Sequence, residues 1–114
     1  MTIEEMSQLI CKAASDKKAS DIVIMDMRNL TSTTDYFVIC SANTATQVRA
    51  IADNIEEEMA KAQIAFNHKE GYREGEWVLL DYGDVVAHVF MQEDREYYAL
   101  ERLWGDAKLT PYED

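Results

Sequence analysis

Cysteine, histidine and basic residues are all scarce in this 114-residue sequence, and each shortage excludes a class of protein. The two cysteines, Cys11 and Cys40, lie far apart and form no C-x-x-C pair, so neither a disulfide framework nor a thiol redox motif is expected. A zinc site needs three or four clustered nitrogen and sulfur ligands, and His68 and His88 are too widely separated to supply them. A lone histidine in an apolar strand pattern, as at His88, is more typical of a core or interface residue than of a metal ligand.

The shortage of basic residues bears on the partner that the protein could bind. Only 11 lysines and arginines stand against 22 acidic residues, which leaves a net charge of −11. A protein that reads nucleic acid directly usually carries a basic surface that neutralises phosphates, so that class is not favoured. An acidic surface instead favours a basic protein partner, although the same charge could serve solubility alone.

Targeting and membrane signals are also missing. The N-terminus carries Glu4 and Glu5 and no basic n-region, which argues against a signal peptide. No apolar run approaches the roughly 18 residues that a membrane span needs. Together with the cysteine pattern, these features predict a protein of the reducing cytoplasm.

The motifs of common enzyme classes are absent as well. The chain has no G-x-x-x-x-G-K-[ST], G-x-G-x-x-G or G-x-S-x-G sequence, and no two aspartates are separated by one residue. Ser41 follows a strand and precedes a helix, where a nucleophile or phosphate site could lie, but a plain turn residue is the simpler interpretation. Asp81 and Asp84 straddle a turn and could meet a cation, yet turns favour aspartate for backbone reasons. We therefore expect no catalytic residue, no cofactor and no metal.

What is present is a regular alternation of helix and strand patterns, with 47% hydrophobic residues. Thr2 and Glu5 form a capping box for a first helix, and Asn43 or Thr44 is placed to cap a second. The expected elements are a helix ending near residues 17–18, strands 21–27 and 36–41, a helix up to residue 62, a short strand 65–68, strands 77–82 and 85–90, and a helix 93–104. This order, α-β-β-α-β-β-β-α, predicts a single α/β domain over residues 1–107, a mixed β-sheet flanked by helices, followed by a short tail, 108–114.

The two strands 77–82 and 85–90 form a predicted hairpin around Gly83-Asp84, and this hairpin is the candidate binding site. Alternation along the first strand gives two faces, one with Trp77, Leu79 and Asp81 and the other with Val78, Leu80 and Tyr82. An aromatic residue, a glycine and two acids thus gather near one tip, and interface hot spots are enriched in tryptophan and tyrosine. The alternative, that Trp77 is an ordinary core residue, stays open.

Three runs of the sequence resemble the ribosomal silencing factor family, also called RsfS or Iojap-like. They are KKASDIVIMDMRNLTSTTDYFVICSANTATQVRAIAD, EGYREGEWVLLDYGDVVAHVF and REYYALERLWGDA, and they span most of the chain, from about Lys17 to Ala107. The specific pieces are Thr34-Asp35-Tyr36-Phe37, Gln47-Val48, Trp77, Asp81-Tyr82-Gly83-Asp84, His88 with Phe90, and Leu100-Glu101 with Leu103-Trp104. One departure is Ala42, where many members have glycine.

The resemblance implies a nucleotidyltransferase-like topology without a cofactor. It implies binding to ribosomal protein fourteen within the large ribosomal subunit, on the face that joins the small subunit. A factor bound there would block subunit joining sterically and damp translation under nutrient limitation. Members often form homodimers, whose surface could overlap the ribosome-binding one. The alternative is a catalytically inactive, nucleotidyltransferase-like dimeric adaptor with a non-ribosomal basic protein partner.

Carried onto this chain, the resemblance assigns partner binding to the hairpin. Trp77 would be the aromatic anchor, and Asp81 and Asp84 would supply charge to basic side chains. Tyr82 would add contact area, and Gly83 would let the turn approach closely. A weaker candidate of the same kind, just before the hairpin, is Glu70.

Overall fold

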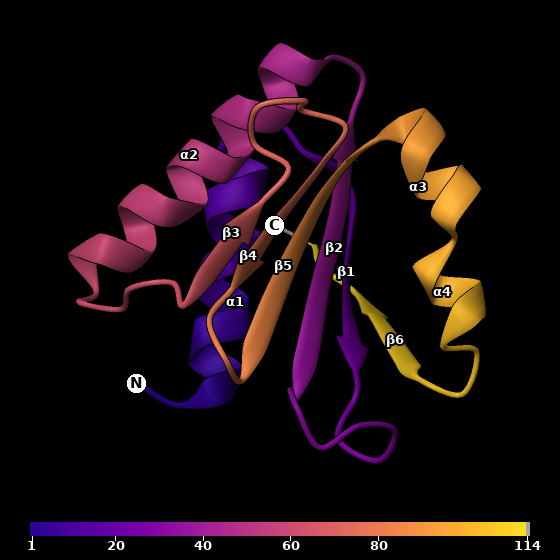
Figure 1. Cartoon of the computed structure of the whole chain (residues 1–114). Helices are drawn as coiled ribbons and strands as arrows, with labels where there is room; N and C mark the ends of the chain where they lie inside the picture. Colours follow the sequence, from indigo (N-terminus) through magenta and orange to yellow (C-terminus); the bar gives the residue numbers. More distant parts are fainter. Residues whose placement is uncertain (114) are drawn as a thin grey trace.

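One mixed sheet of six strands organises the computed structural model, which describes residues 1–113 (Figure 1). The strands lie in the order β3-β4-β5-β2-β1-β6. Their bounds are β1 Ser20–Asp26, β2 Tyr36–Ala42, β3 His68–Glu70, β4 Trp77–Asp81, β5 Val85–Met91 and β6 Lys108–Pro111. The helices are α1 Ile3–Asp16, α2 Ala45–Lys61, α3 Gln92–Tyr98 and α4 Leu100–Leu103. The predicted fold class, a single α/β domain with a mixed sheet flanked by helices, is confirmed.

The centre of the sheet is its one parallel pair among the described strands, β2 with β5. Tyr36 is aligned with Val85 at one end of this pair and Ala42 with Met91 at the other. Parallel neighbours need a long crossover connection, and here α2, β3 and β4 provide it. The predicted hairpin of β4 and β5 is confirmed, with Trp77 opposite Phe90 and Asp81 opposite Val86.

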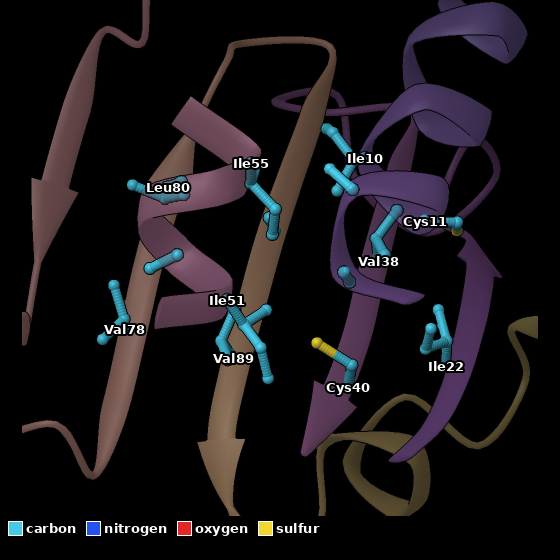
Figure 2. Close-up of a cluster of buried hydrophobic side chains, with 14 of the residues drawn as sticks. Ile10, Cys11, Ile22, Val38, Cys40, Ile51, Ile55, Val78, Leu80 and Val89 are labelled. Atoms are coloured by element: carbon cyan, nitrogen blue, oxygen red, sulfur yellow. The ribbon is translucent and has the colours of Figure 1, made fainter. Parts of the chain in front are cut away.

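The helices α1 and α2 cover one face of the sheet and form the main core with it (Figures 1 and 2). The backbone N–H of Glu5 donates to Thr2 Oγ1 at 3.1 Å and the Thr2 N–H donates to Glu5 Oε1 at 2.9 Å, so the predicted capping box is confirmed. Of the two predicted caps for α2, Thr44 is the one used. Cys11 and Cys40 are free and buried in this core, and burial raises the pKa of each thiol to about 12, which makes them unreactive.

The opposite face carries a smaller core, packed under α3 and α4. Its buried members are Met25, Met27, Ile39, Phe90 and Leu100. The sequence predicts one helix over residues 93–104, and this prediction is wrong, because Ala99 adopts a left-handed conformation with φ 46° and separates α3 from α4. The break turns Leu100 into the small core, whereas Tyr97, on α3, is 81% exposed.

The strand β6 is absent from the predicted element order, which places residues 108–114 in a tail. Its residues pair antiparallel with β1, with Val23 opposite Pro111 and Asp26 opposite Lys108. The tail therefore adds an edge strand to the sheet, and only Asp114 lies outside the described residues. The short strand expected at 65–68 is also displaced and runs from His68 to Glu70. Within residues 1–113, the helices are all too short or too polar to span a membrane.

Candidate functional site

The strand register gathers the candidate residues on the sheet face opposite α1 and α2. Residues directly opposite each other in a sheet point to the same side, so the pairing decides which side chains are neighbours. Three cross-strand rows lie on this face, namely Trp77 with Phe90 and Ser41, Glu70 with Leu79, His88 and Ile39, and His68 with Asp81, Val86 and Phe37. The helices α3 and α4 cover part of it, and Phe37, Trp77, Leu79 and Asp81 remain partly exposed. We call the region of these four residues the open face.

Trp77 is held on the open face by three ring systems. Its indole stacks on Phe90, with ring centroids 4.8 Å apart, and lies 4.7 Å from the ring of Tyr98 on α3. The indole Nε1–H donates a hydrogen bond of 3.1 Å to Nδ1 of His88. Trp77 is therefore fixed on one side by the small core while the rest of its ring stays accessible. It is neither an ordinary core residue nor a fully exposed interface residue.

His88 is buried behind Trp77 and is only 4% exposed. Burial lowers its pKa to about 3, so the imidazole is neutral at physiological pH. Because Nδ1 accepts from Trp77, the ring proton must be on Nε2. Among residues 1–113, no group of three or more histidine, cysteine or acidic side chains is placed to hold a metal ion.

A groove with a volume of about 230 Å³ runs beside Trp77 on the open face. It is lined by Glu70, Gly71, Trp77 and Leu79, so it joins two of the predicted site residues with two that were not assigned to the site. Gly71 has φ +81°, and a Cβ atom at this position would lie 1.9 Å from the carbonyl oxygen of Trp77. Only glycine allows β3 to approach β4 in this way. In the sequence, Gly71 is the one signal that could have indicated the close approach of β3 to β4 and the groove beside it.

The acidic residues of the site surround this groove and the hairpin turn. Asp81 Oδ1 accepts from the backbone N–H of Gly83 at 2.7 Å, and Gly83 takes φ +85°, as the predicted turn requires. The Asp84 side chain is exposed, while its carbonyl oxygen accepts from the backbone N–H of Asp35 at 2.8 Å, which ties the turn to the start of β2. Glu70 is exposed and approaches Nε2 of His68 at 3.2 Å. The open face thus has an apolar centre and an acidic border.

Tyr82 does not belong to this surface, and the expectation that it adds contact area is wrong. Strand alternation directs it to the α2 side of the sheet with Val78 and Leu80, where it is only 6% exposed. Burial raises the pKa of its phenol, and the hydroxyl has no hydrogen-bond partner among residues 1–113. Tyr82 supports the hairpin from behind instead of meeting a partner.

A larger pocket, of about 500 Å³, lies elsewhere, where α3 and α4 meet the end of the sheet. Arg95 is buried beside it, and its Nη1 donates to the carbonyl oxygen of Asp21 at 2.7 Å and to Ser41 Oγ at 3.2 Å. The Ser41 hydroxyl in turn donates to Gln92 Oε1 at 2.9 Å. Ser41 is therefore a buried residue of β2 in a polar network that fastens α3 to the sheet. The interpretation of this serine as a plain turn residue is wrong, because β2 extends through it to Ala42.

Comparison with known proteins gives one consistent family. A family model described as "Ribosomal silencing factor during starvation" matches residues 1–114. The ribosomal silencing factor RsfS of Bacillus subtilis is 43% identical over 110 residues, which cover 96% of this chain and 93% of that protein. The RsfS of Halalkalibacterium halodurans is 42% identical over 113 residues, covering 99% and 97%. A crystal structure of a Chromobacterium violaceum protein superposes with a TM-score of 0.91 at 36% identity, covering 100% of this chain and 95% of the other.

Proposed function

Since this chain belongs to the ribosomal silencing factor family, we propose that it represses translation by binding the large ribosomal subunit through ribosomal protein fourteen. Bound there, it would exclude the small subunit sterically, without catalysis and without a cofactor. The family description refers to starvation, which supports a role in damping translation when nutrients are limited. Such a protein would act in the cytoplasm, where the subunits join.

The observation that carries this proposal is the composition of the open face. Trp77 and Leu79 line a groove that a side chain of a partner could enter, and Phe37 extends the apolar area. Interfaces of this type combine an aromatic anchor at the centre with a polar border. The acids Asp81 and Glu70 stand at that border, so a surface with lysine or arginine around an apolar centre would fit it.

The overall charge supports contact with ribosomal protein instead of ribosomal RNA. With a net charge of −11, the chain is repelled by phosphate and attracted by basic protein surface. Repulsion from the surrounding RNA would confine docking to the protein patch and so add specificity.

We further propose that the free protein forms a homodimer through the same open face, so that self-association and ribosome binding compete.

Sucrose-gradient sedimentation with purified ribosomal subunits tests the proposal. The wild type should travel with large subunits and reduce the amount of joined ribosomes. Trp77→Ala should weaken binding by roughly thirtyfold, as expected for an aromatic hot spot. Gln8→Ala, an exposed position on α1 at the opposite face, is the matched control and should bind like the wild type.

Two results would contradict the proposal. If the folded wild type stays at the top of the gradient, the chain does not bind ribosomes, and the dimeric adaptor with another basic partner becomes the better hypothesis. An enzymatic role predicts nucleotide binding, and a ligand at 100 times its dissociation constant would stabilise the fold by about 2.7 kcal/mol. We expect no change in melting temperature with ATP and Mg²⁺. A rise in melting temperature of that size would be the second contradicting result and would favour the enzymatic role.

A further inference from the structure

We propose that His88 is a positioning residue for partner binding: it holds the indole of Trp77 in the orientation that the partner meets. The inference rests on the proposed docking at the open face, in which Trp77 is the anchor. It assigns to His88 a role in function, beyond its place as a buried residue behind Trp77.

The geometry joins the two residues across β4 and β5. Leu79 stands directly opposite His88, and Trp77 stands opposite Phe90, so the Trp77 indole reaches His88 diagonally. Its Nε1–H meets Nδ1 at 3.1 Å, and the two ring centroids are 5.9 Å apart. This is the one hydrogen bond that the Trp77 side chain makes within residues 1–113.

The chemistry of His88 indicates that packing alone does not explain a histidine here. The Nε2–H of the buried ring has no hydrogen-bond acceptor among the described residues, and its environment is aromatic, with the Phe37 ring centroid at 4.5 Å. A buried N–H without an acceptor destabilises a fold, and phenylalanine would fill this space without that cost. What histidine supplies and phenylalanine lacks is the acceptor at Nδ1. That acceptor is used by Trp77 alone.

The state of the imidazole makes it a dependable acceptor. Burial keeps the pKa of His88 far below neutral pH, so Nδ1 retains its lone pair. A protonated ring would carry hydrogen on both nitrogens and could not accept from the indole. Trp77 is consequently held in one rotamer before the partner arrives. Such preorganisation strengthens binding, because less side-chain freedom is lost on docking.

A two-by-two set of variants tests the inference: wild type, His88→Phe, Trp77→Phe and the double variant. Affinity for purified large ribosomal subunits should fall about fivefold in His88→Phe, because the freed Trp77 side chain must then be immobilised on docking. In the double variant, the loss should equal that of Trp77→Phe alone, because Trp77→Phe already lacks the indole donor. Additive losses would overturn the inference.

A spectroscopic measurement separates this inference from the proposed function. In ¹⁵N-labelled protein, the indole N–H of Trp77 should exchange slowly with solvent and the His88 ring should show the Nε2–H tautomer. His88→Phe should accelerate that exchange at least tenfold. Failure of the wild type to bind ribosomes, with the spectroscopic result as expected, would refute the docking and leave the geometry standing. An unprotected indole in the wild type would refute the positioning role itself.

A second pair of variants covers the case in which His88→Phe does not fold. His88→Asn and His88→Leu are similar in size, but only asparagine can place an acceptor oxygen near the position of Nδ1. The inference requires tighter ribosome binding and slower indole exchange in His88→Asn than in His88→Leu. Equal behaviour of the two variants would contradict it, and if neither folds, the exchange rate and tautomer of the wild type decide.

Discussion

Leu79 and Leu80 are adjacent on β4, and replacing Leu80 with alanine should mainly lower stability, whereas replacing Leu79 should mainly weaken binding. Leu80 is fully buried under α2 in the main core, whereas Leu79 lies on the open face, where it lines the groove beside Trp77. The two residues have the same side chain and lie on the same strand. Only the face that each occupies distinguishes them.

The expected magnitudes follow from burial. Leu80→Ala removes a fully enclosed side chain and leaves a cavity, which should lower the free energy of unfolding by about 3 kcal/mol. Leu79→Ala opens towards solvent and creates no closed cavity, so its cost should be about 1 kcal/mol, part of the transfer free energy of one leucine. At about 4 °C per kcal/mol for a domain of this size, the melting temperature should fall by roughly 12 °C and 4 °C, respectively.

Thermal unfolding followed by circular dichroism measures the first effect, and sedimentation with large ribosomal subunits measures the second. Leu79→Ala should weaken ribosome binding by about tenfold, the loss expected when a side chain is removed from the interface centre. Leu80→Ala should bind normally at temperatures where it is folded. If Leu79→Ala unfolds as readily as Leu80→Ala and binds like the wild type, the face of Leu79 is core and the open face is wrongly assigned.

Three further predictions concern single positions. Gly71→Ala should lower the free energy of unfolding by about 2 kcal/mol or more, measured by urea denaturation, because its Cβ would collide with the carbonyl oxygen of Trp77 and its φ is positive. Because the pKa of His88 is lowered to about 3 on folding, the unfolded chain binds the extra proton, so stability should fall as the pH drops from about 6.5 towards 3, by up to about 1.4 kcal/mol per pH unit. Urea denaturation at pH 7 and pH 5 measures this effect. The free energy of unfolding should fall less between the two pH values in His88→Phe than in the wild type. Ala99→Gly should raise the melting temperature by about 4 °C, measured by calorimetry, since glycine accepts the left-handed conformation that separates α3 from α4; a lowered melting temperature would refute this account of the break.

The elements predicted well are those with a strong local pattern. The capping box of Thr2 and the predicted cap at Asn43 or Thr44 locate the starts of both long helices, and alternation along β4 divides its side chains between two faces as the structure has them. These signals act over a few residues, so the sequence alone contains them. The same alternation groups Tyr82 with Val78 and Leu80, which are buried, whereas its assignment to the binding surface rests on the enrichment of tyrosine at interfaces and on the family resemblance.

The missed features depend on contacts between distant segments. The strand β6 has four exposed residues and ends at Pro111, so it has no apolar alternation and exists only through backbone pairing with β1. Nothing in the sequence around Ala99 marks a helix end, because the break follows from the packing of Leu100 on the sheet. Phe37 joins the open face because β2 lies beside β5, an arrangement that no local pattern encodes. Partner binding by Trp77, Asp81, Asp84 and Glu70 stays a prediction.

The parallel pairing of β2 with β5 also governs the order in which a newly made chain can fold. The first half of the chain supplies α1, β1, β2 and α2, yet the strand beside β2 is completed only at Met91. Until then, one edge of β2 is open and the apolar side of α2 lacks the packing that β4 and β5 supply. Pairings between distant segments slow folding, since the loop must close before the contact forms. A nascent chain is therefore expected to acquire its stable sheet late in synthesis, when β5 pairs with β2, and β6 then adds the outermost strand beside β1.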